Sequence, residues 1–354
     1  MYMISALISY ASTSAGSLMT NFAVPYLTDW GECNSNNSTW SSNCFHAYLV
    51  FLSIYAVLVI ILTLVGLSGQ GLIQSAFTVY RYLVLIICII TVTIAIFMKP
   101  FPVSISPHVQ TVPDWQFQNL GVLIPTLFFA NIGHHSLPGL VAPLNNKKKI
   151  RKALRSVVIL LTVTYILLCT TSVLYFGKDT GELLSLMWKS YPWGYDTTPW
   201  WGSVVRQLVV LFVPIVCLSA FPINAITLGN NIYESVCPPH KREYMAESRM
   251  KKIRVFCLLA FSIPALAIAV FARKLSTILS FGGLTGFFIA LAIPAMLHLS
   301  SRERCISLWN SKITGKNRFS SFFSKPIFAY LIIYIAIVAS VVTANSLIRD
   351  IFFV

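Results

Sequence analysis

Apolar and polar positions alternate along this chain in long blocks. The apolar blocks are about 20 residues each, the length at which a helix crosses the ~30 Å hydrocarbon core of a bilayer. We therefore predict an all-α, multi-pass membrane protein that forms a single transmembrane domain over residues 1–354. The nine predicted spans are roughly 1–27, 46–66, 77–98, 119–143, 156–176, 204–228, 255–272, 276–299 and 326–347.

Composition supports the membrane prediction. The chain is 56% hydrophobic and only 10% charged, whereas a soluble domain carries about 25% charged residues. Its net charge of +15 would suit a nucleic-acid-binding protein. The charges instead lie in short loops between apolar spans, so we expect no nucleic-acid partner. The first span, 1–27, lacks the basic start of a signal peptide and is rich in small and hydroxyl residues, as in helices that pack tightly or border a cavity.

The first loop, 28–45, orients the predicted spans. It holds two overlapping glycosylation sequons, at Asn36 and Asn37, and two cysteines, Cys33 and Cys44, that we expect to pair in a disulfide. Glycans and disulfides form in the lumenal or extracellular compartment. A chance Asn/Ser-rich loop is the alternative. Together the four residues predict that loop 28–45 is lumenal or extracellular.

The basic residues agree with this orientation. Loops 144–155, 229–254 and 300–325 each contain six Lys or Arg residues, and Arg81 lies on the same side. Cytoplasmic loops carry such an excess of positive charge. The run "NNKKKIRKALR" also suits lipid headgroups, although orientation alone explains it. The N-terminus is therefore predicted to be cytoplasmic and the C-terminus lumenal or extracellular.

One apolar run is interrupted by polar and helix-breaking residues. The stretch 128–143 reads "FFANIGHHSLPGLVAP", and non-helical backbone at membrane depth survives only where it is buried in protein or lines a wet cavity. Transporters use such breaks to bind substrates and cations. A kinked helix whose histidines bond to neighbouring helices is the alternative. The predicted substrate-binding residues are Asn131, Gly133, His134, His135, Ser136 and Gly139.

Two further stretches are irregular. In 211–231, two prolines bracket Ser219, whose hydroxyl we predict as a cation ligand because hydroxyl and carbonyl oxygens beside helix breaks suit Na⁺. The alternative is that the polar side chains of this stretch bond back to their own helix. In 281–294, Gly282, Gly283 and Gly286 predict close helix packing.

Other chemistries find little support. All eleven Asp and Glu residues fall in loops or at span ends, which disfavours carboxylate proton relays. The eight cysteines form no CxxC pair, and the adjacent histidines lack a third ligand nearby, so no metal site is expected. The chain shows no nucleophile–base spacing or nucleotide motif. We expect neither an enzyme nor a cofactor, apart from Na⁺ or H⁺ as a coupling ion.

The same stretches resemble the amino acid/auxin permease superfamily, and within it the transmembrane protein 104 family. The similarity lies in "HHSLPGLVAPLNNKKKI", "LFVPIVCLSAFPINAITLGNN" and "VVTAN". It implies a fold of eleven spans with two inverted five-span repeats, of the amino-acid/sodium symporter type. The nine spans would then be the third to the eleventh, and the first two would be absent. By this resemblance 119–143 is the broken sixth helix, and 204–228 is the eighth, which helps form a sodium site.

The residues and the resemblance together predict a transporter-like domain. We expect a secondary transporter that moves amino acids or related small zwitterions by alternating access around the broken helix at 128–143. Its partners would be an amino-acid-like small molecule and the lipid bilayer. A non-transporting scaffold or ligand sensor with the same fold is the alternative. If protons drive transport, His134 or His135 is the predicted carrier, since histidine titrates near neutral pH.

Overall fold

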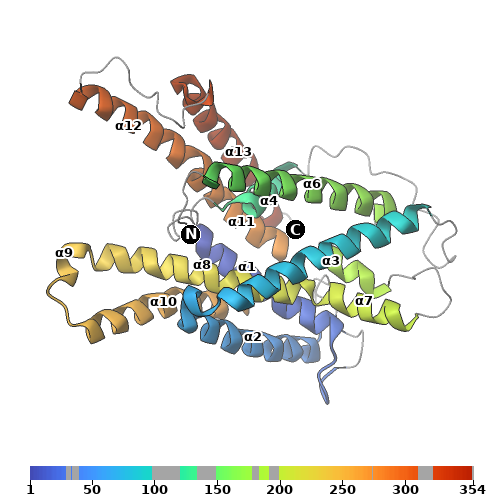
Figure 1. Ribbon diagram of the computed structural model, residues 1–354. Helices are drawn as coiled ribbons and strands as arrows, with labels where there is room; N and C mark the ends of the chain where they lie inside the picture. The colour runs from blue at the N-terminus through green and yellow to red at the C-terminus, as the bar shows by residue number, and fades with distance from the viewer. Residues whose placement is uncertain are drawn as a thin grey trace. The chain divides into compact units, whose positions relative to one another are not determined.

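The protein is described here from a computed structural model. The structure describes residues 1–28, 33, 40–97, 120–133, 149–177, 183–190, 199–272, 274–309 and 322–352. Within these ranges the chain is helical and contains no β-strand (Figure 1). The prediction of an all-α fold is confirmed.

Most helices are long. They are, in chain order, α1 (Tyr2–Asn21), α2 (Ser42–Gly69), α3 (Gly71–Phe97), α4 (Leu120–Asn131), α6 (Ile150–Phe176), the 3₁₀-helix η5 (Leu184–Ser190), α7 (Trp200–Val210), α8 (Phe212–Val236), α9 (Pro239–Arg242), α10 (Glu247–Ala269), α11 (Leu275–Phe287), the π-helix η6 (Phe288–Ala292), α12 (Ile293–Trp309), the 3₁₀-helix η7 (Phe322–Ser324) and α13 (Pro326–Phe352).

Seven helical segments of the described chain are long and apolar enough to cross a membrane. Two of these combine consecutive helices, α7 with α8 and α11 with η6 and α12. The multi-pass prediction is thereby confirmed. The other two predicted spans coincide with α4, which has twelve residues, and with α1, which has twenty but is rich in serine and threonine. α1 is therefore not among the seven segments.

Several helices extend beyond the predicted spans. α3 begins at Gly71, six residues before the predicted start at 77, and α8 continues to Val236. The α11–η6–α12 segment continues to Trp309. Helices can extend past the apolar run because polar residues at their ends remain helical in the headgroup region or in water.

The chain divides into two compact units. Unit 1 comprises 1–5, 116–144 and 276–354, and unit 2 comprises 6–115 and 145–275. The sequence predicts that residues 1–354, and therefore both units, form one transmembrane domain. This stays a prediction.

α8 lies at the centre of unit 2, where it packs against α2, α3 and α10. Leu7, Ala11 and Ala15 of α1 recur every four residues and are fully buried in the core that α8 and α2 share. Such spacing places side chains on one helix face. A second core centres on Trp188 of η5, which is fully buried and donates from Nε1 to Thr91 Oγ1 of α3 at 3.2 Å.

Unit 1 contains α4, α11, η6, α12 and α13 with the first turn of α1. α13 packs against α4, η6 and α12, and in Figure 1 the red α13 runs beside the orange α12. The five-residue π-helix Phe288–Ala292 comes just before Pro294. Proline supplies no N–H to the helix, and a π-turn is one way a helix adjusts its backbone hydrogen bonds.

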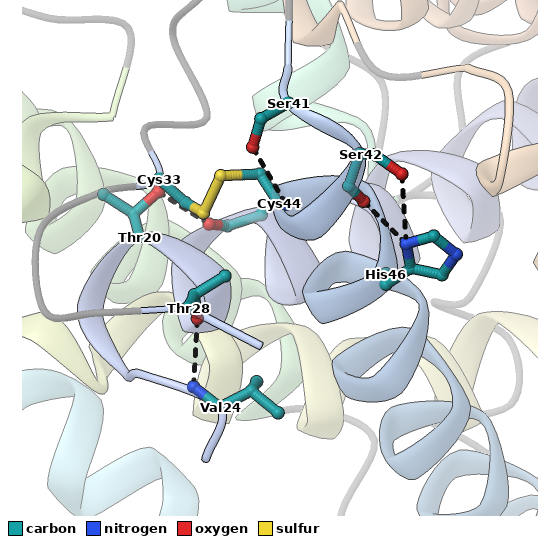
Figure 2. Close-up of a disulfide and its surroundings, with 9 residues drawn as sticks. Thr20, Val24, Thr28, Cys33, Ser41, Ser42, Cys44 and His46 are labelled. Atoms are coloured by element: carbon teal, nitrogen blue, oxygen red, sulfur yellow. Dashed lines mark hydrogen bonds between the residues drawn. A yellow bond between two sulfur atoms is a disulfide. The ribbon is translucent and has the colours of Figure 1, made fainter. Parts of the chain in front are cut away.

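A disulfide closes the segment between α1 and α2, as the sequence predicts. Cys33 and Cys44 are bonded, with their Cα atoms 5.5 Å apart (Figure 2). The first turn of α2 is capped beside it, because the N–H of Cys44 donates to Ser41 Oγ at 3.2 Å. His46 Nδ1 lies 2.7 Å from the C=O of Ser42. The sequon residues Asn36 and Asn37 lie outside the described residues, so their glycosylation stays a prediction.

Candidate substrate site at the end of α4

α4 carries the described part of the predicted substrate site. The helix ends at Asn131, and the next N–H, of Ile132, donates to the C=O of Phe128 at 3.1 Å. The Asn131 side chain folds back along the helix and donates from Nδ2 to the C=O of Leu127 at 2.8 Å. The helix therefore stops inside the apolar run, at the start of the stretch that the sequence marks as irregular.

The predicted site residues divide between described and undescribed parts of the chain. Asn131 and Gly133 are described, and both are exposed at the end of α4. His134, His135, Ser136 and Gly139 lie outside the described residues, so their role stays a prediction. The last turn of a helix has carbonyl groups without helical partners and the negative end of the helix dipole. This end of α4 therefore suits a cation or an ammonium group.

α4 is seated on a groove of glycines in α11. A methyl group added to any of Gly282, Gly283 or Gly286 would lie closer than 3.0 Å to an atom of α4 or of the segment just after it. The pairs are Gly282 with Phe129, Gly283 with Pro125, and Gly286 with Ile132. The glycines were predicted to allow close packing, and this is confirmed. They position the last two turns of α4, where the site begins.

The beginning of α4 contacts α13 just as closely. A methyl group on Gly121 would meet the Cβ atom of Ser346 at 2.5 Å. Pro125, one turn further along, has no N–H, so the C=O of Gly121 lacks its usual helical partner. α4 is thus a short, proline-containing helix, held along its length by small residues of two neighbours.

An aromatic cluster surrounds the end of α4. The Tyr2 hydroxyl donates to the C=O of Phe129 at 3.4 Å, and the two rings are 5.4 Å apart. Phe128 meets the fully buried ring of Phe287 edge-on, with centroids 4.9 Å apart. These rings exclude water from one side of the helix end. Tyr2 also satisfies one of the terminal carbonyls, which have no partner within the helix.

The second predicted site lies in unit 2, on α8. Ser219 is buried, and its hydroxyl donates to Gln74 Oε1 of α3 at 2.6 Å. Gln74 Nε2 donates in return to the C=O of Ser219 and to Gln70 Oε1, both at 3.1 Å. Gln70, fully buried, donates to the C=O of Leu62. A continuous polar chain thus runs from the end of α2 to the middle of α8.

The other polar residues of this stretch bond to their own helix. Asn224 Nδ2 donates to the C=O of Ala220 at 3.0 Å, and Thr227 Oγ1 donates to the C=O of Ile223 at 2.8 Å. This is the arrangement foreseen as the alternative to cation binding, and it holds for these two residues. Ser219 differs, because its proton points to another helix and its oxygen lone pairs remain available. Its role as a cation ligand stays a prediction.

Tyr2 and Gln74 are candidate site residues that sequence reasoning missed. Both lie far along the chain from their partners, Tyr2 by 127 residues and Gln74 by 145. No local pattern marks either one. Among the described residues, no three His, Cys, Asp or Glu side chains come close enough to hold a metal ion.

Comparison with protein families gives a match over nearly the whole chain. The family model described as "Transmembrane amino acid transporter protein" matches residues 2–348. Three similar proteins carry the name "Transmembrane protein 104 homolog". They come from Drosophila melanogaster (33% identical over 56% of this chain), Dictyostelium discoideum (23% over 68%) and Caenorhabditis elegans (25% over 80%).

These matches cover only part of the relatives. The chain spans 39% of the Drosophila protein, 48% of the Dictyostelium protein and 61% of the Caenorhabditis elegans protein. No solved structure matches the chain.

Proposed function

Because this chain belongs to the family of transmembrane amino acid transporter proteins, we propose that it moves amino acids or related small zwitterions across a membrane by alternating access. The transported solute enters the bundle from the aqueous phase on one side and leaves on the other. Helices move around a binding site at membrane depth, and this movement opens the site to one side of the membrane and then to the other, as in other secondary transporters.

The observation that supports this proposal best is the end of α4. The helix stops at Asn131 inside an apolar run, on the glycine groove of α11 and beside the rings of Tyr2 and Phe128. Its terminal carbonyls suit the ammonium group of a zwitterion. The substrate carboxylate would then bind the following residues, 134–139, where the predicted break offers backbone N–H groups.

The coupling ion is proposed to be Na⁺ or H⁺. For Na⁺, the ligand set would include the Ser219 hydroxyl, whose oxygen keeps its lone pairs while its proton bonds to Gln74. For H⁺, the carrier would be His134 or His135. The two ions predict different pH dependences, since only proton coupling makes the pH dependence of uptake rest on titration of a histidine.

Uptake by reconstituted vesicles tests the proposal. The printed chain and the longest chain that its gene encodes are each reconstituted and offered labelled amino acids, with a Na⁺ gradient, a pH gradient or neither. We expect gradient-driven accumulation of at least one amino acid. Absence of any gradient-driven uptake by the longest chain refutes the transport proposal.

The same preparation distinguishes the alternative, a non-transporting scaffold or ligand sensor. A sensor would bind a labelled amino acid saturably in detergent without accumulating it in vesicles. A transporter gives both binding and accumulation.

The histidines are tested separately. If protons are coupled, His134→Ala or His135→Ala should flatten the dependence of uptake on external pH, because the group that titrates is removed. His298→Ala is the matched control: this histidine lies on α12, with Nε2 3.0 Å from the C=O of Ser324, away from α4 in the chain. An unchanged pH profile in both site variants excludes them as proton carriers.

A further inference from the structure

α10 begins with a group of basic residues and continues as an apolar helix. It runs from Glu247 to Ala269 and is one of the seven segments long and apolar enough to cross a membrane. Its first two turns hold four basic residues: Arg249, Lys251, Lys252 and Arg254. From Val255 to Ala269 the helix contains no charged residue. The basic residues therefore lie where a membrane-spanning helix meets the lipid headgroups.

One face of α10 packs against α8 and α2. Its buried residues Leu258, Ser262, Ala265 and Ala269 recur every three or four positions, a spacing that places them on one side of the helix. Gly229 of α8 lies close to this face, because a Cβ added there would meet the Cα atom of Leu258 at 2.9 Å. This side of α10 is therefore covered by protein.

Two of the four basic residues have partners within the protein. Lys251 Nζ lies 2.8 Å from Glu247 Oε1, and Arg254 Nε donates to Asn230 Oδ1 of α8 at 3.2 Å. Both follow the register of the buried face, since Lys251 precedes Leu258 by seven residues and Arg254 precedes it by four. Their charged groups are therefore engaged by α10 itself and by α8.

The other two basic residues, Arg249 and Lys252, lie on the opposite face and are exposed. In the part of the chain that the structure describes, neither side chain makes an ion pair or a hydrogen bond. Phe256 follows Lys252 by one turn and is 71% exposed, and Ile263 follows Phe256 by two turns and is 51% exposed. The spacing of three, four and seven residues places all four on one face. We call these four residues the lipid face of α10.

No acidic residue neutralises the lipid face. Glu247 is the only acid in α10, and it pairs with Lys251. Glu234 of α8 pairs with Arg242 at 3.0 Å. Glu243 is exposed and lies before the helix begins. Two unpaired cations are thus followed, along the same face, by exposed apolar side chains.

We propose that the lipid face of α10 binds an anionic phospholipid, with the lipid phosphate against Arg249 and Lys252 and an acyl chain along Phe256 and Ile263. Helix side chains lean toward the helix N-terminus. At this end of α10 the two basic groups therefore extend away from the apolar run and toward the headgroups. Anionic lipid attracts basic residues in this position.

A phospholipid fits this face better than a soluble phosphate does. A soluble phosphate would neutralise the two cations and leave Phe256 and Ile263 uncovered, whereas a phospholipid matches both the charged and the apolar part. The proposed lipid site lies in unit 2, and it stands whether or not the protein transports amino acids.

Photocross-linking to a labelled lipid locates the site. The full chain, purified in detergent, is mixed with phosphatidylglycerol that carries a diazirine on one acyl chain, illuminated and digested with trypsin. The tryptic peptide 255–273 contains Phe256 and Ile263 and begins after Arg254, so it is the same in every variant described below. We expect a saturable cross-link in this peptide. Unlabelled phosphatidylglycerol should displace it, and phosphatidylcholine or glycerol phosphate should not.

Four variants assign the cross-link to the lipid face. Arg249→Gln and Lys252→Gln should each raise the lipid concentration for half-maximal cross-linking about five-fold, the equivalent of about 1 kcal/mol for one basic residue near anionic lipid. Lys251→Gln is the matched control. It removes the same charge from the same turn of α10, but on the side that faces α8, and it should change that concentration less than about two-fold. Arg249→Lys, which keeps the charge, should also behave like the unchanged protein.

Three outcomes overturn the proposal. The first is the absence of a saturable cross-link in peptide 255–273. The second is displacement by phosphatidylcholine or glycerol phosphate as effective as displacement by phosphatidylglycerol. The third is an equal effect of Lys251→Gln and Lys252→Gln, which would show that net charge rather than this face sets the affinity. These measurements involve no flux, so their outcome is independent of the vesicle uptake test.

Discussion

Ser219 of α8 and Gln74 of α3 hold each other by two hydrogen bonds. The Ser219 hydroxyl donates to Gln74 Oε1 at 2.6 Å, and Gln74 Nε2 donates to the Ser219 C=O at 3.1 Å. Ser219 lies three residues before Pro222, which has no N–H, so the C=O of Leu218 lacks its usual partner within α8. The Ser219–Gln74 pair therefore joins α8 to α3 next to the position where α8 lacks a backbone hydrogen bond.

Removing either partner should destabilise the protein. Ser219→Ala or Gln74→Leu leaves a buried polar group without its partner, which costs about 1–3 kcal/mol. The double variant should cost less than the sum, because one variant already removes the interaction that the other would break. Denaturant unfolding in detergent measures all three.

Ser53→Ala is the control for this pair. Ser53 is exposed, and its hydroxyl bonds only within α2, to the C=O of Leu49. Its loss should change the free energy of unfolding by no more than about 0.5 kcal/mol. Strictly additive effects of Ser219→Ala and Gln74→Leu would contradict the paired arrangement.

A methyl group in the glycine groove should disturb α4. Gly283→Ala places Cβ against the backbone and ring of Pro125, and overpacking of this kind costs about 1–3 kcal/mol. We also expect lower uptake, since the end of α4 would shift. Gly71→Ala is the matched control, because nothing lies within 4 Å of the added methyl. Thermal unfolding and uptake of both variants are measured together, and equal behaviour would refute the groove as a positioning device.

Reduction of the Cys33–Cys44 disulfide should lower stability. The bond closes a loop with a sequence separation of 11, for which chain entropy gives about 3 kcal/mol. Cys33→Ser with Cys44→Ser should match the reduced protein in Tm and should no longer respond to reductant. Cys305→Ser, which removes a free cysteine of α12, should leave the response intact. If reductant still lowers the Tm of the double variant, the effect comes from other cysteines and the prediction is wrong.

The predicted orientation is testable through glycosylation. Expressed in a eukaryotic cell, the chain should shift in electrophoretic mobility on treatment with an N-glycosidase, and Asn36→Gln with Asn37→Gln should abolish the shift. Lys312→Thr creates a sequon at Asn310 in loop 300–325. Because this loop is predicted to be cytoplasmic, the new sequon should remain unmodified. A glycan at Asn310 would show that loop 300–325 is lumenal or extracellular, and this would contradict the predicted orientation.

Helix content and membrane character could be predicted from the sequence because they depend on local runs. A block of about 20 apolar residues favours a membrane helix whatever its neighbours are. The Cys33–Cys44 disulfide was also predictable, since its two cysteines lie in one short segment. Gly282, Gly283 and Gly286 indicated a close contact, because closely spaced glycines on one helix allow another to approach.

The partners in these contacts were decided by the tertiary structure. In a membrane protein the lipid-facing and the packed faces of a helix are both apolar, so periodicity does not reveal which face meets which helix. Nothing in the sequence thus indicated that the glycines of α11 receive α4, that Tyr2 reaches the C=O of Phe129, or that Gln74 bonds to Ser219. The sequence alone determined which segments are helical and apolar. The tertiary structure alone decided which polar groups those helices bring together, because these contacts join residues more than 100 positions apart in the chain.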